Sequence, residues 1–243
     1  MDEVNYKNNF ERTLDYLYKF DREKVLKSLI DTDTPTILDV GSNVGQTLRE
    51  FKKWWPKSYV HCFEPLPEFY DELIKFGDDR VYYWNYGLGN ENKTDKFYYH
   101  KIQPMLSGFE KLNTESKDSV AINEPKLAGM KDGEFLDNIN DEVSVEVQRL
   151  DDIWDGSKVH ILKMDTQGWE TEILKGAQET LERTEVVLTE LNFYDLYESR
   201  KSFSSIEKYL LPKGFRLYDI SHISKNPMNG RTDWVDVIYK KEK

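Results

Sequence analysis

Two short segments of the sequence combine glycines with a carboxylate in a pattern typical of nucleoside binding. The first is Asp39-Val-Gly-Ser-Asn-Val-Gly-Gln46, in which Gly41 and Gly45 can form a turn of bare backbone. The second is Phe63-Glu64-Pro65, and Glu64 comes nineteen residues after Gly45. A turn without side chains lets a nucleoside approach the backbone closely, and a carboxylate can accept hydrogen bonds from both hydroxyls of a ribose. The spacing therefore predicts a nucleoside site formed by Gly41, Gly45 and Glu64.

A third segment, Leu162-Lys-Met-Asp-Thr-Gln-Gly-Trp-Glu170, places further acids after an apolar run. A buried strand here would deliver Asp165 to the edge that carries the glycine turn, and Glu190 stands near the end of the next expected strand. Glu170 would lie in the first turn of a helix, where the helix dipole stabilises an anion. An alcohol is a poor nucleophile until a base removes its proton. Asp165 and Glu190 are therefore candidate catalytic residues, together with His222 in an expected late loop.

Strand and helix patterns alternate along the chain and predict a doubly wound, mostly parallel α/β sheet. In such a sheet ligands bind at the carboxyl ends of the strands. The last two strands suit an antiparallel closing pair, because a polar loop joins them. The expected strands are Thr36–Val40, Tyr59–Phe63, Val81–Trp84, Lys96–Tyr99, Val143–Val147, Val159–Met164, Val186–Leu191, Phe215–Ile220 and Trp234–Tyr239, and the expected helices are Gly45–Trp55, Pro67–Phe76, Thr171–Arg183 and Phe203–Leu211.

Length and composition indicate one domain over residues 1–243, with an N-terminal helical segment at 1–33. Residues 101–142 are polar and too long for an ordinary connection, so we expect an insertion or lid near the acceptor. The net charge is −11 and no basic stripe occurs, which argues against a nucleic-acid partner. No apolar run is long enough to span a membrane. The polar N-terminus and the single cysteine, Cys62, favour a cytoplasmic location.

Together these segments resemble FkbM-type methyltransferases. The resemblance also includes Gly87-Leu-Gly-Asn90, Arg149-Leu-Asp-Asp152 and Leu174-Lys-Gly-Ala177, and it runs from about residue 36 to the end, apart from the insertion. It implies a Rossmann-like class I fold with a seven-stranded sheet and S-adenosylmethionine as the methyl donor. It also implies transfer to a hydroxyl, with a sugar of a glycan or of a glycosylated small molecule as the expected acceptor.

The resemblance assigns roles to the residues of the glycine turn and its neighbours. Gly41 and Gly45 would pass the methionyl part of the cofactor, Asp39 would lie near its amino group, and Glu64 would hold the ribose. Amide side chains of the turn could reach the methionyl carboxylate, and two residues after the third strand could border the adenine. The complete expected cofactor set is Asp39, Gly41, Ser42, Asn43, Gly45, Gln46, Glu64, Pro65, Asn85, Tyr86 and Asp165.

Three alternatives use the same residues. A dinucleotide-binding oxidoreductase is disfavoured, because Asn43 and Gln46 stand where its loop needs the second and third glycines. A metal-assisted methyltransferase of a non-sugar molecule would let Asp165 and Glu190 hold a divalent cation. Two acids without a third partner do not favour that site, so we expect no metal ligands. The third alternative is a methyltransferase-like module without activity. The oligomeric state cannot be derived from these patterns.

Overall fold

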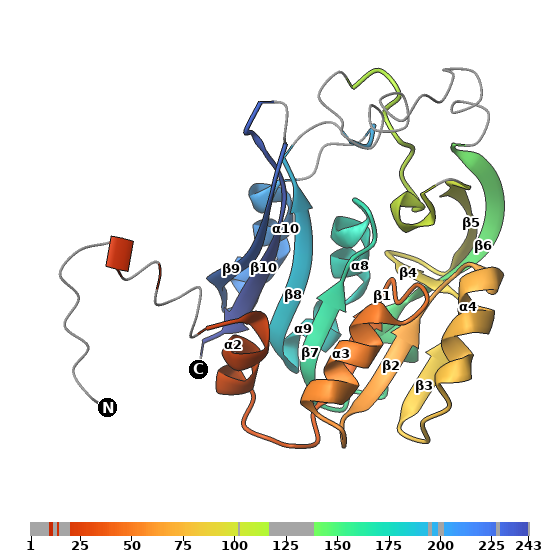
Figure 1. Ribbon diagram of the computed structural model, residues 1–243. Coiled ribbons are helices and arrows are strands. Elements are labelled where there is room, and N and C mark those ends of the chain that lie inside the picture. The colour runs from red at the N-terminus through yellow and green to blue at the C-terminus, as the bar shows by residue number, and fades with distance from the viewer. Residues whose placement is uncertain are drawn as a thin grey trace.

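The computed structural model describes residues 10, 11, 14, 20–101, 103–116, 139–193, 196–198, 202–226 and 229–242. Its main sheet has seven strands in the order β3-β2-β1-β7-β8-β10-β9 (Figure 1). β10 runs antiparallel to β8 and β9, whereas the other neighbouring strands are parallel. This confirms the expected α/β sheet with an antiparallel closing strand. The strands are β1 (Thr36–Val40), β2 (Tyr59–Phe63), β3 (Val81–Trp84), β7 (Val159–Met164), β8 (Thr184–Asn192), β9 (Phe215–Lys225) and β10 (Thr232–Lys241).

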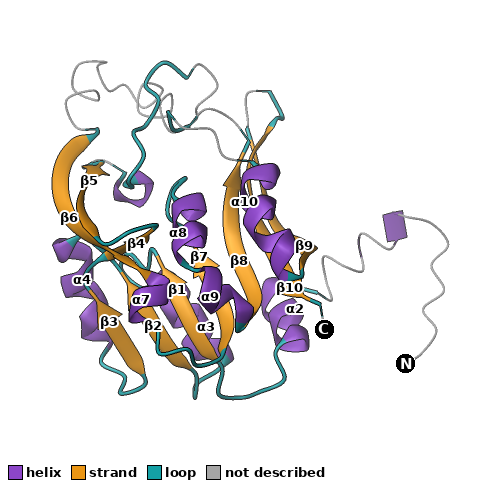
Figure 2. Ribbon diagram, turned by 180° about the vertical axis from the view of Figure 1, so that it is seen from behind, coloured by secondary structure: helices purple, strands orange, loops and turns teal. Residues whose placement is uncertain are grey.

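Helices cover both faces of the sheet (Figures 1 and 2). One face packs against α2 (Arg22–Leu29), α3 (Gln46–Trp54) and α4 (Pro67–Leu73), and the other against α7 (Leu150–Ile153), α8 (Glu170–Gly176), α9 (Gln178–Glu182) and α10 (Phe203–Leu210). The central strands β1 and β7 are almost continuously buried, as parallel strands covered by helices on both faces should be. Among the described helices, none is long and apolar enough to cross a membrane.

A smaller sheet has the order β4-β6-β5, formed by β4 (Gly87–Gly89), β5 (Lys93–Tyr99) and β6 (Asp141–Arg149). The strands expected at Lys96–Tyr99 and Val143–Val147 are parts of β5 and β6. β6 lies between β4 and β5 and separates them, parallel to β4 and antiparallel to β5. This sheet brings the start of the 101–142 insertion beside the carboxyl edge of the main sheet.

The second half of the chain differs from the sequence prediction in one helix and one strand. The helix expected over 171–183 is broken at Ala177 into α8 and α9, where Gly176 packs so closely on β4 that a Cβ would lie 1.9 Å from the carbonyl oxygen of Gly89. β9 continues past Ile220 to Lys225, so His222 lies on a strand and not in a loop. The polar residues in this second half hide the strand pattern, because an exposed edge strand needs no apolar alternation. Short 3-10 helices at η1 (Ile74–Phe76), η2 (Pro104–Leu106) and η3 (Leu211–Lys213) complete the described elements.

Candidate active site

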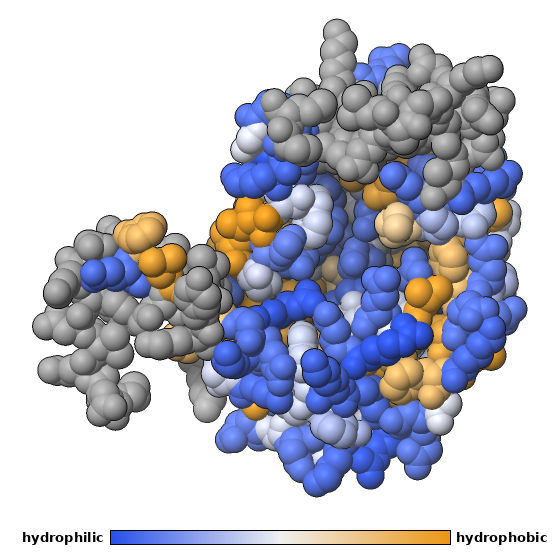
Figure 3. Space-filling model, in the orientation of Figure 1, coloured by the Kyte–Doolittle hydropathy of each residue, from blue (hydrophilic) through white to orange (hydrophobic). Residues whose placement is uncertain are grey.

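A cavity of about 950 Å³ opens where β1, β2, β7 and β8 end. The space-filling view shows a hollow on this face of the molecule (Figure 3). Eight of the residues predicted from the sequence line it: Gly41, Ser42, Asn43, Gln46, Glu64, Pro65, Asp165 and Glu190. The folded chain therefore brings together the glycine turn, Glu64 and Asp165, although Asp165 lies more than a hundred residues after the other two in the sequence.

The two glycines of the turn are required by the backbone and by the protein's own packing. Gly41 has φ +75° and Gly45 has φ +81°, a region that side chains rarely allow. A Cβ on Gly41 would lie 2.0 Å from the carbonyl oxygen of Asp165, and one on Gly45 would lie 2.9 Å from Leu73. Gly41 lines the cavity, whereas Gly45 does not. The turn thus sets Gly41 directly against the segment that carries Asp165.

Glu64 is buried beside the turn and keeps its carboxylate fixed by two backbone amides. Its Oε2 accepts a hydrogen bond from the amide of Asn43 and its Oε1 accepts one from the amide of Leu66, both at 2.9 Å. Burial raises the pKa of Glu64 to about 7 despite these two bonds. Each carboxylate oxygen can accept a second hydrogen bond. The two carboxylate oxygens can therefore accept hydrogen bonds from the two hydroxyls of a ribose.

The residues after β3 support this corner without lining the cavity. The side-chain amide of Asn85 donates to the carbonyl oxygens of Glu64 at 2.9 Å and Pro65 at 3.2 Å. The ring of Tyr86 packs 6.0 Å from that of Phe63. The adjacent cavity wall is apolar and comes instead from Leu66, Phe69, Gly87 and Leu88. Neither Asn85 nor Tyr86 lines the cavity. Contacts between these two residues and an adenine stay a prediction.

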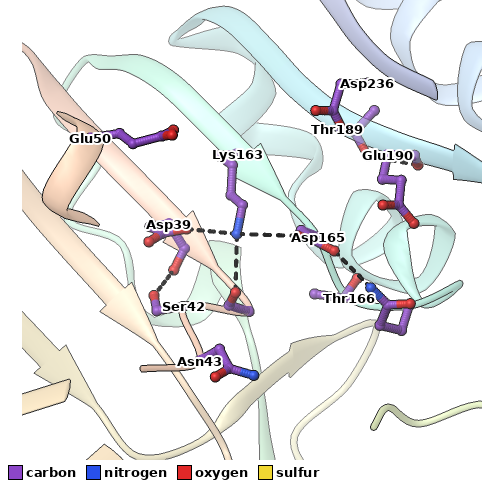
Figure 4. A network of polar contacts seen from close by, with 12 residues as sticks. Asp39, Ser42, Asn43, Glu50, Lys163, Asp165, Thr166, Thr189, Glu190 and Asp236 are labelled. Atoms are coloured by element: carbon purple, nitrogen blue, oxygen red, sulfur yellow. Dashed lines mark hydrogen bonds and ion pairs between the residues drawn. The ribbon is translucent and has the colours of Figure 1, made fainter. Parts of the chain in front are cut away.

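A buried lysine connects the glycine turn to the acid after β7 (Figure 4). Lys163 on β7 lies directly across from Asp39 on β1, and its Nζ is 2.9 Å from Asp39 Oδ1. The same Nζ donates to the carbonyl oxygen of Gly41 at 3.0 Å and lies 4.0 Å from Asp165 Oδ2. Burial disfavours the ammonium, but the carboxylates of Asp39 and Asp165 outweigh this and raise the pKa of Lys163. Asp39 itself is fully buried and does not line the cavity.

Glu170 fixes the turn that follows β7. Its Oε1 accepts hydrogen bonds from the amide and hydroxyl of Thr166, both at 3.0 Å, and from the amide of Gly168 at 3.4 Å. Gln167 then donates through Nε2 to Asp165 Oδ1 at 3.0 Å. Glu170 is buried and is absent from the cavity lining, whereas Asp165 lines it with a side chain that is 42% exposed. Glu170 thus acts on the turn, and Asp165 is the acid that a ligand would meet.

Glu190 lies on the opposite wall, near the end of β8, in an acidic surrounding. Burial raises its pKa well above the ordinary value, and the charges of Asp165, Asp236 and Glu170 raise it further. Its Oε1 accepts one hydrogen bond, from Asn192 at 3.1 Å. Such a carboxyl takes up a proton more readily than an ordinary glutamate, which suits general acid–base chemistry near neutral pH.

The wall around Glu190 carries the groups that an acceptor would meet. Trp234 and Asn192 line it, and Asn192 Oδ1 is buried without a hydrogen-bond partner in the described part of the chain. Residues 103–109 of the insertion also line the cavity, held by the pair of hydrogen bonds between Tyr98 and Gly108 at 2.8 and 3.1 Å. His222 is exposed, stacks on Trp234 with ring centroids 4.7 Å apart, and is not among the lining residues.

Sequence reasoning gave no role to Lys163 or Asn192. A charged residue inside the buried run Val159–Met164 was the available signal for Lys163, because lysine is rarely buried without a partner. Asn192 carried no comparable signal. Within the described residues, no group of three or more His, Cys, Asp or Glu side chains is arranged to hold a metal ion.

Comparisons with known proteins agree with this geometry. The family model described as Methyltransferase FkbM domain matches residues 39–217. The 2-O-methyltransferase NoeI of Sinorhizobium fredii is 29% identical over 185 residues, covering 74% of this chain and 72% of the relative. Methyltransferase 1 of Beauveria bassiana is 27% identical over 195 residues, covering 75% and 73%.

A solved structure from Listeria monocytogenes, described as a candidate S-adenosylmethionine-dependent methyltransferase, has a TM-score of 0.48 at 7% identity and covers 90% of this chain and 97% of its own. The family assignment rests on the match over residues 39–217, which is well over half of the 243 residues. It supports methyltransferase activity and S-adenosylmethionine as the methyl donor. The chain therefore belongs to the FkbM methyltransferase family.

Proposed function

We propose that this protein transfers the methyl group of S-adenosylmethionine to a hydroxyl group of a sugar-containing acceptor. The observation that carries the proposal is the division of one cavity between two kinds of wall. The glycine turn and Glu64 form the wall that suits a nucleoside, and Glu190, Asn192 and Trp234 form the wall opposite. A methyl donor and a hydroxyl can then meet between them.

The wall formed by the glycine turn and Glu64, here called the donor wall, would bind and orient S-adenosylmethionine. Glu64 would accept the two ribose hydroxyls, and the backbone around Gly41 would lie along the methionyl part. Asp165 offers a carboxylate to a cationic group at the same end of the cavity. When bound, S-adenosylmethionine supplies a methyl carbon already activated by a sulfonium. The protein's task is then to hold the acceptor oxygen in line with that carbon, which can supply much of the rate acceleration.

Glu190 is the best placed base for the acceptor hydroxyl. As the oxygen forms its bond to the methyl carbon, the carbon–sulfur bond breaks with its electron pair going to sulfur, and Glu190 takes the hydroxyl proton. Asp165 is less suited to this step, because it is more exposed and already engaged by Gln167. Its negative charge nevertheless raises the proton affinity of Glu190. We therefore assign Glu190 as the base and Asp165 to orientation of the ligands.

The wall formed by Glu190, Asn192 and Trp234, here called the acceptor wall, has groups that suit a sugar. An indole offers an apolar face to the C–H groups of a sugar ring, and the amide of Asn192 and the carboxyl of Glu190 can bind its hydroxyls. The name of the relative NoeI, a 2-O-methyltransferase, supports transfer to oxygen. The acidic surface of this chain also favours a neutral acceptor over a polyanion.

A methyl-transfer assay tests the proposal. The purified protein would be incubated with S-adenosylmethionine and either glycosides and oligosaccharides or matched cyclohexanols, and S-adenosylhomocysteine and methylated product would be measured by mass spectrometry. We expect product with sugars and little with the cyclohexanols. Turnover confined to non-sugar alcohols would contradict the acceptor assignment, and binding of S-adenosylhomocysteine without turnover on any acceptor would favour a non-catalytic module.

A further inference from the structure

Lys163 contacts more groups than a charge-neutralising partner of Asp39 needs to. Its side chain is 6% exposed and reaches from β7 across to β1. Its ion pair with Asp39 joins Nζ to Oδ1 at 2.9 Å. The ammonium also holds the carbonyl oxygen of Gly41 at 3.0 Å and stands 4.0 Å from Asp165 Oδ2. One cation thus touches the start of the glycine turn and the acid that faces the ligand.

The contact with Gly41 reaches the donor wall through the backbone. The carbonyl oxygen of Gly41 points toward Lys163. The amide groups of the next residues can then point toward the cavity wall that carries Glu64. The amide of Asn43, two residues on, donates to Glu64 at 2.9 Å. The left-handed conformations of Gly41 and Asn43 leave this turn little intrinsic preference for its observed shape. Lys163 holds the carbonyl side of Gly41, and the carbonyl oxygen of Phe63 holds the other side by accepting hydrogen bonds from the amides of Gly41 and Ser42 at 3.0 and 3.1 Å.

We propose that Lys163 is a positioning residue for the methyl donor: it holds the glycine turn and the Asp165 carboxylate in the arrangement that receives the methionyl end. The inference rests on the proposed function only in the identity of the ligand. Lys163 need not touch the reacting atoms. It acts through Gly41 and Asp165, and its effect should appear in donor affinity.

A double variant separates positioning from simple charge neutralisation. Removing one member of a buried ion pair leaves an uncompensated charge and is strongly destabilising, whereas replacing both members is often close to neutral. Lys163→Met should therefore lower the melting temperature, and adding Asp39→Asn should restore much of it. If Lys163 positions the donor, the double variant should still bind S-adenosylhomocysteine at least tenfold more weakly than the wild-type protein in calorimetry. Wild-type affinity in the restored double variant would overturn the proposal.

The chain contains a matched control pair outside the cavity lining. Lys52 lies 3.0 Å from Asp78 Oδ2 and donates to the carbonyl of Ser58 at 3.0 Å, and its side chain is 7% exposed. It thus repeats the combination of buried lysine, carboxylate and backbone carbonyl. Lys52→Met and its double variant with Asp78→Asn should follow the same pattern of melting temperatures. Their affinity for S-adenosylhomocysteine should stay within twofold of wild type.

A second variant decides the matter if the double variant does not fold. Lys163→Arg keeps a positive charge beside Asp39, but its longer, planar group cannot hold the two oxygens of Asp39 and Gly41 in the same geometry. We expect it to fold and to bind S-adenosylhomocysteine several-fold more weakly, and wild-type affinity would refute the positioning role. Failure of the wild-type protein itself to bind this ligand would instead contradict the proposed function, so the two failures are distinguishable.

Discussion

The affinity for the methyl donor should depend on pH through Glu64. The residue is 4% exposed, and burial raises the pKa of its carboxyl to about 7 in the free protein. Ribose hydroxyls that donate to it favour the charged form, so binding should release a proton near neutral pH. With a pKa of about 7, roughly one tenth of the molecules carry the charged form at pH 6 and roughly nine tenths at pH 8. The dissociation constant should therefore fall by about tenfold between pH 6 and pH 8.

Glu64→Gln should remove this dependence and weaken binding. Both carboxylate oxygens accept a backbone amide, from Asn43 and from Leu66. A glutamine must turn its own NH2 toward one of those donors, which leaves a buried amide unsatisfied at a cost of about 1–3 kcal/mol. It also offers a neutral acceptor to the ribose. At pH 8 we expect the variant to bind about 10 to 100 times more weakly, in line with the loss of charge-assisted hydrogen bonds.

Calorimetry with S-adenosylhomocysteine at pH 6, 7 and 8 measures both effects. Adenosine is the matched ligand control, because it keeps the ribose and lacks the titratable methionyl part. A pH-independent affinity of the wild-type protein, or an equal slope in Glu64→Gln, would refute the reasoning. The free protein should show the opposite trend in stability. Since the folded-state pKa of Glu64 lies above its usual 4.5, this group's contribution to the free energy of unfolding falls as the pH rises from about 4.5 to about 7.

Three further predictions concern catalysis, the glycine turn and metal ions. Glu190→Gln should lower kcat by at least about a hundredfold, while its affinity for S-adenosylhomocysteine stays within about threefold of wild type. The kcat of the wild-type protein should rise with pH through the raised pKa of Glu190. An unchanged kcat in the variant would remove the role of Glu190 as base. Gly41→Ala should lower the free energy of unfolding by about 3 kcal/mol in urea titrations, because it adds a clash with the Asp165 carbonyl to left-handed strain. Gly230→Ala, with φ +73° and no atom within 4 Å of the added Cβ, should cost only about 1 kcal/mol. Turnover should survive dialysis against EDTA, and loss of activity with recovery on adding magnesium would restore the metal-assisted alternative.

The cavity wall formed by the glycine turn and Glu64 could be predicted from the sequence because each of its parts is local. Gly41 and Gly45 predict a turn by their residue type. Glu64 directly follows the apolar run Tyr59–Phe63, which predicts a buried parallel strand, so Glu64 is expected at the carboxyl end of that strand. The strand order then places them side by side by a general rule of α/β sheets. Nothing more than the periodicity of strands and helices is needed for this step.

The contact between Lys163 and Asp39 could not be derived in the same way. The two residues are 124 positions apart, and they meet only because β1 and β7 pair with Asp39 opposite Lys163. A shift of that register by one residue would place the lysine on the other face of the sheet. The extension of β9 to His222 was missed for a related reason. An exposed edge strand is specified by its pairing with β10 and not by its own apolar pattern.

The cavity shows how one sheet edge can give similar side chains different tasks. Glu64 and Glu190 are both buried glutamates whose pKa values are raised, but backbone amides bind Glu64 and acidic neighbours surround Glu190. The amides favour the charged form, as a ribose acceptor requires, whereas the nearby acids raise the proton affinity of Glu190, which favours transfer of a proton to its carboxylate. Two buried glutamates with such different neighbours are suited to separate roles in binding and proton transfer. Asp165 contributes to this division, since its charge raises the proton affinity of Glu190 while Lys163 keeps it in place.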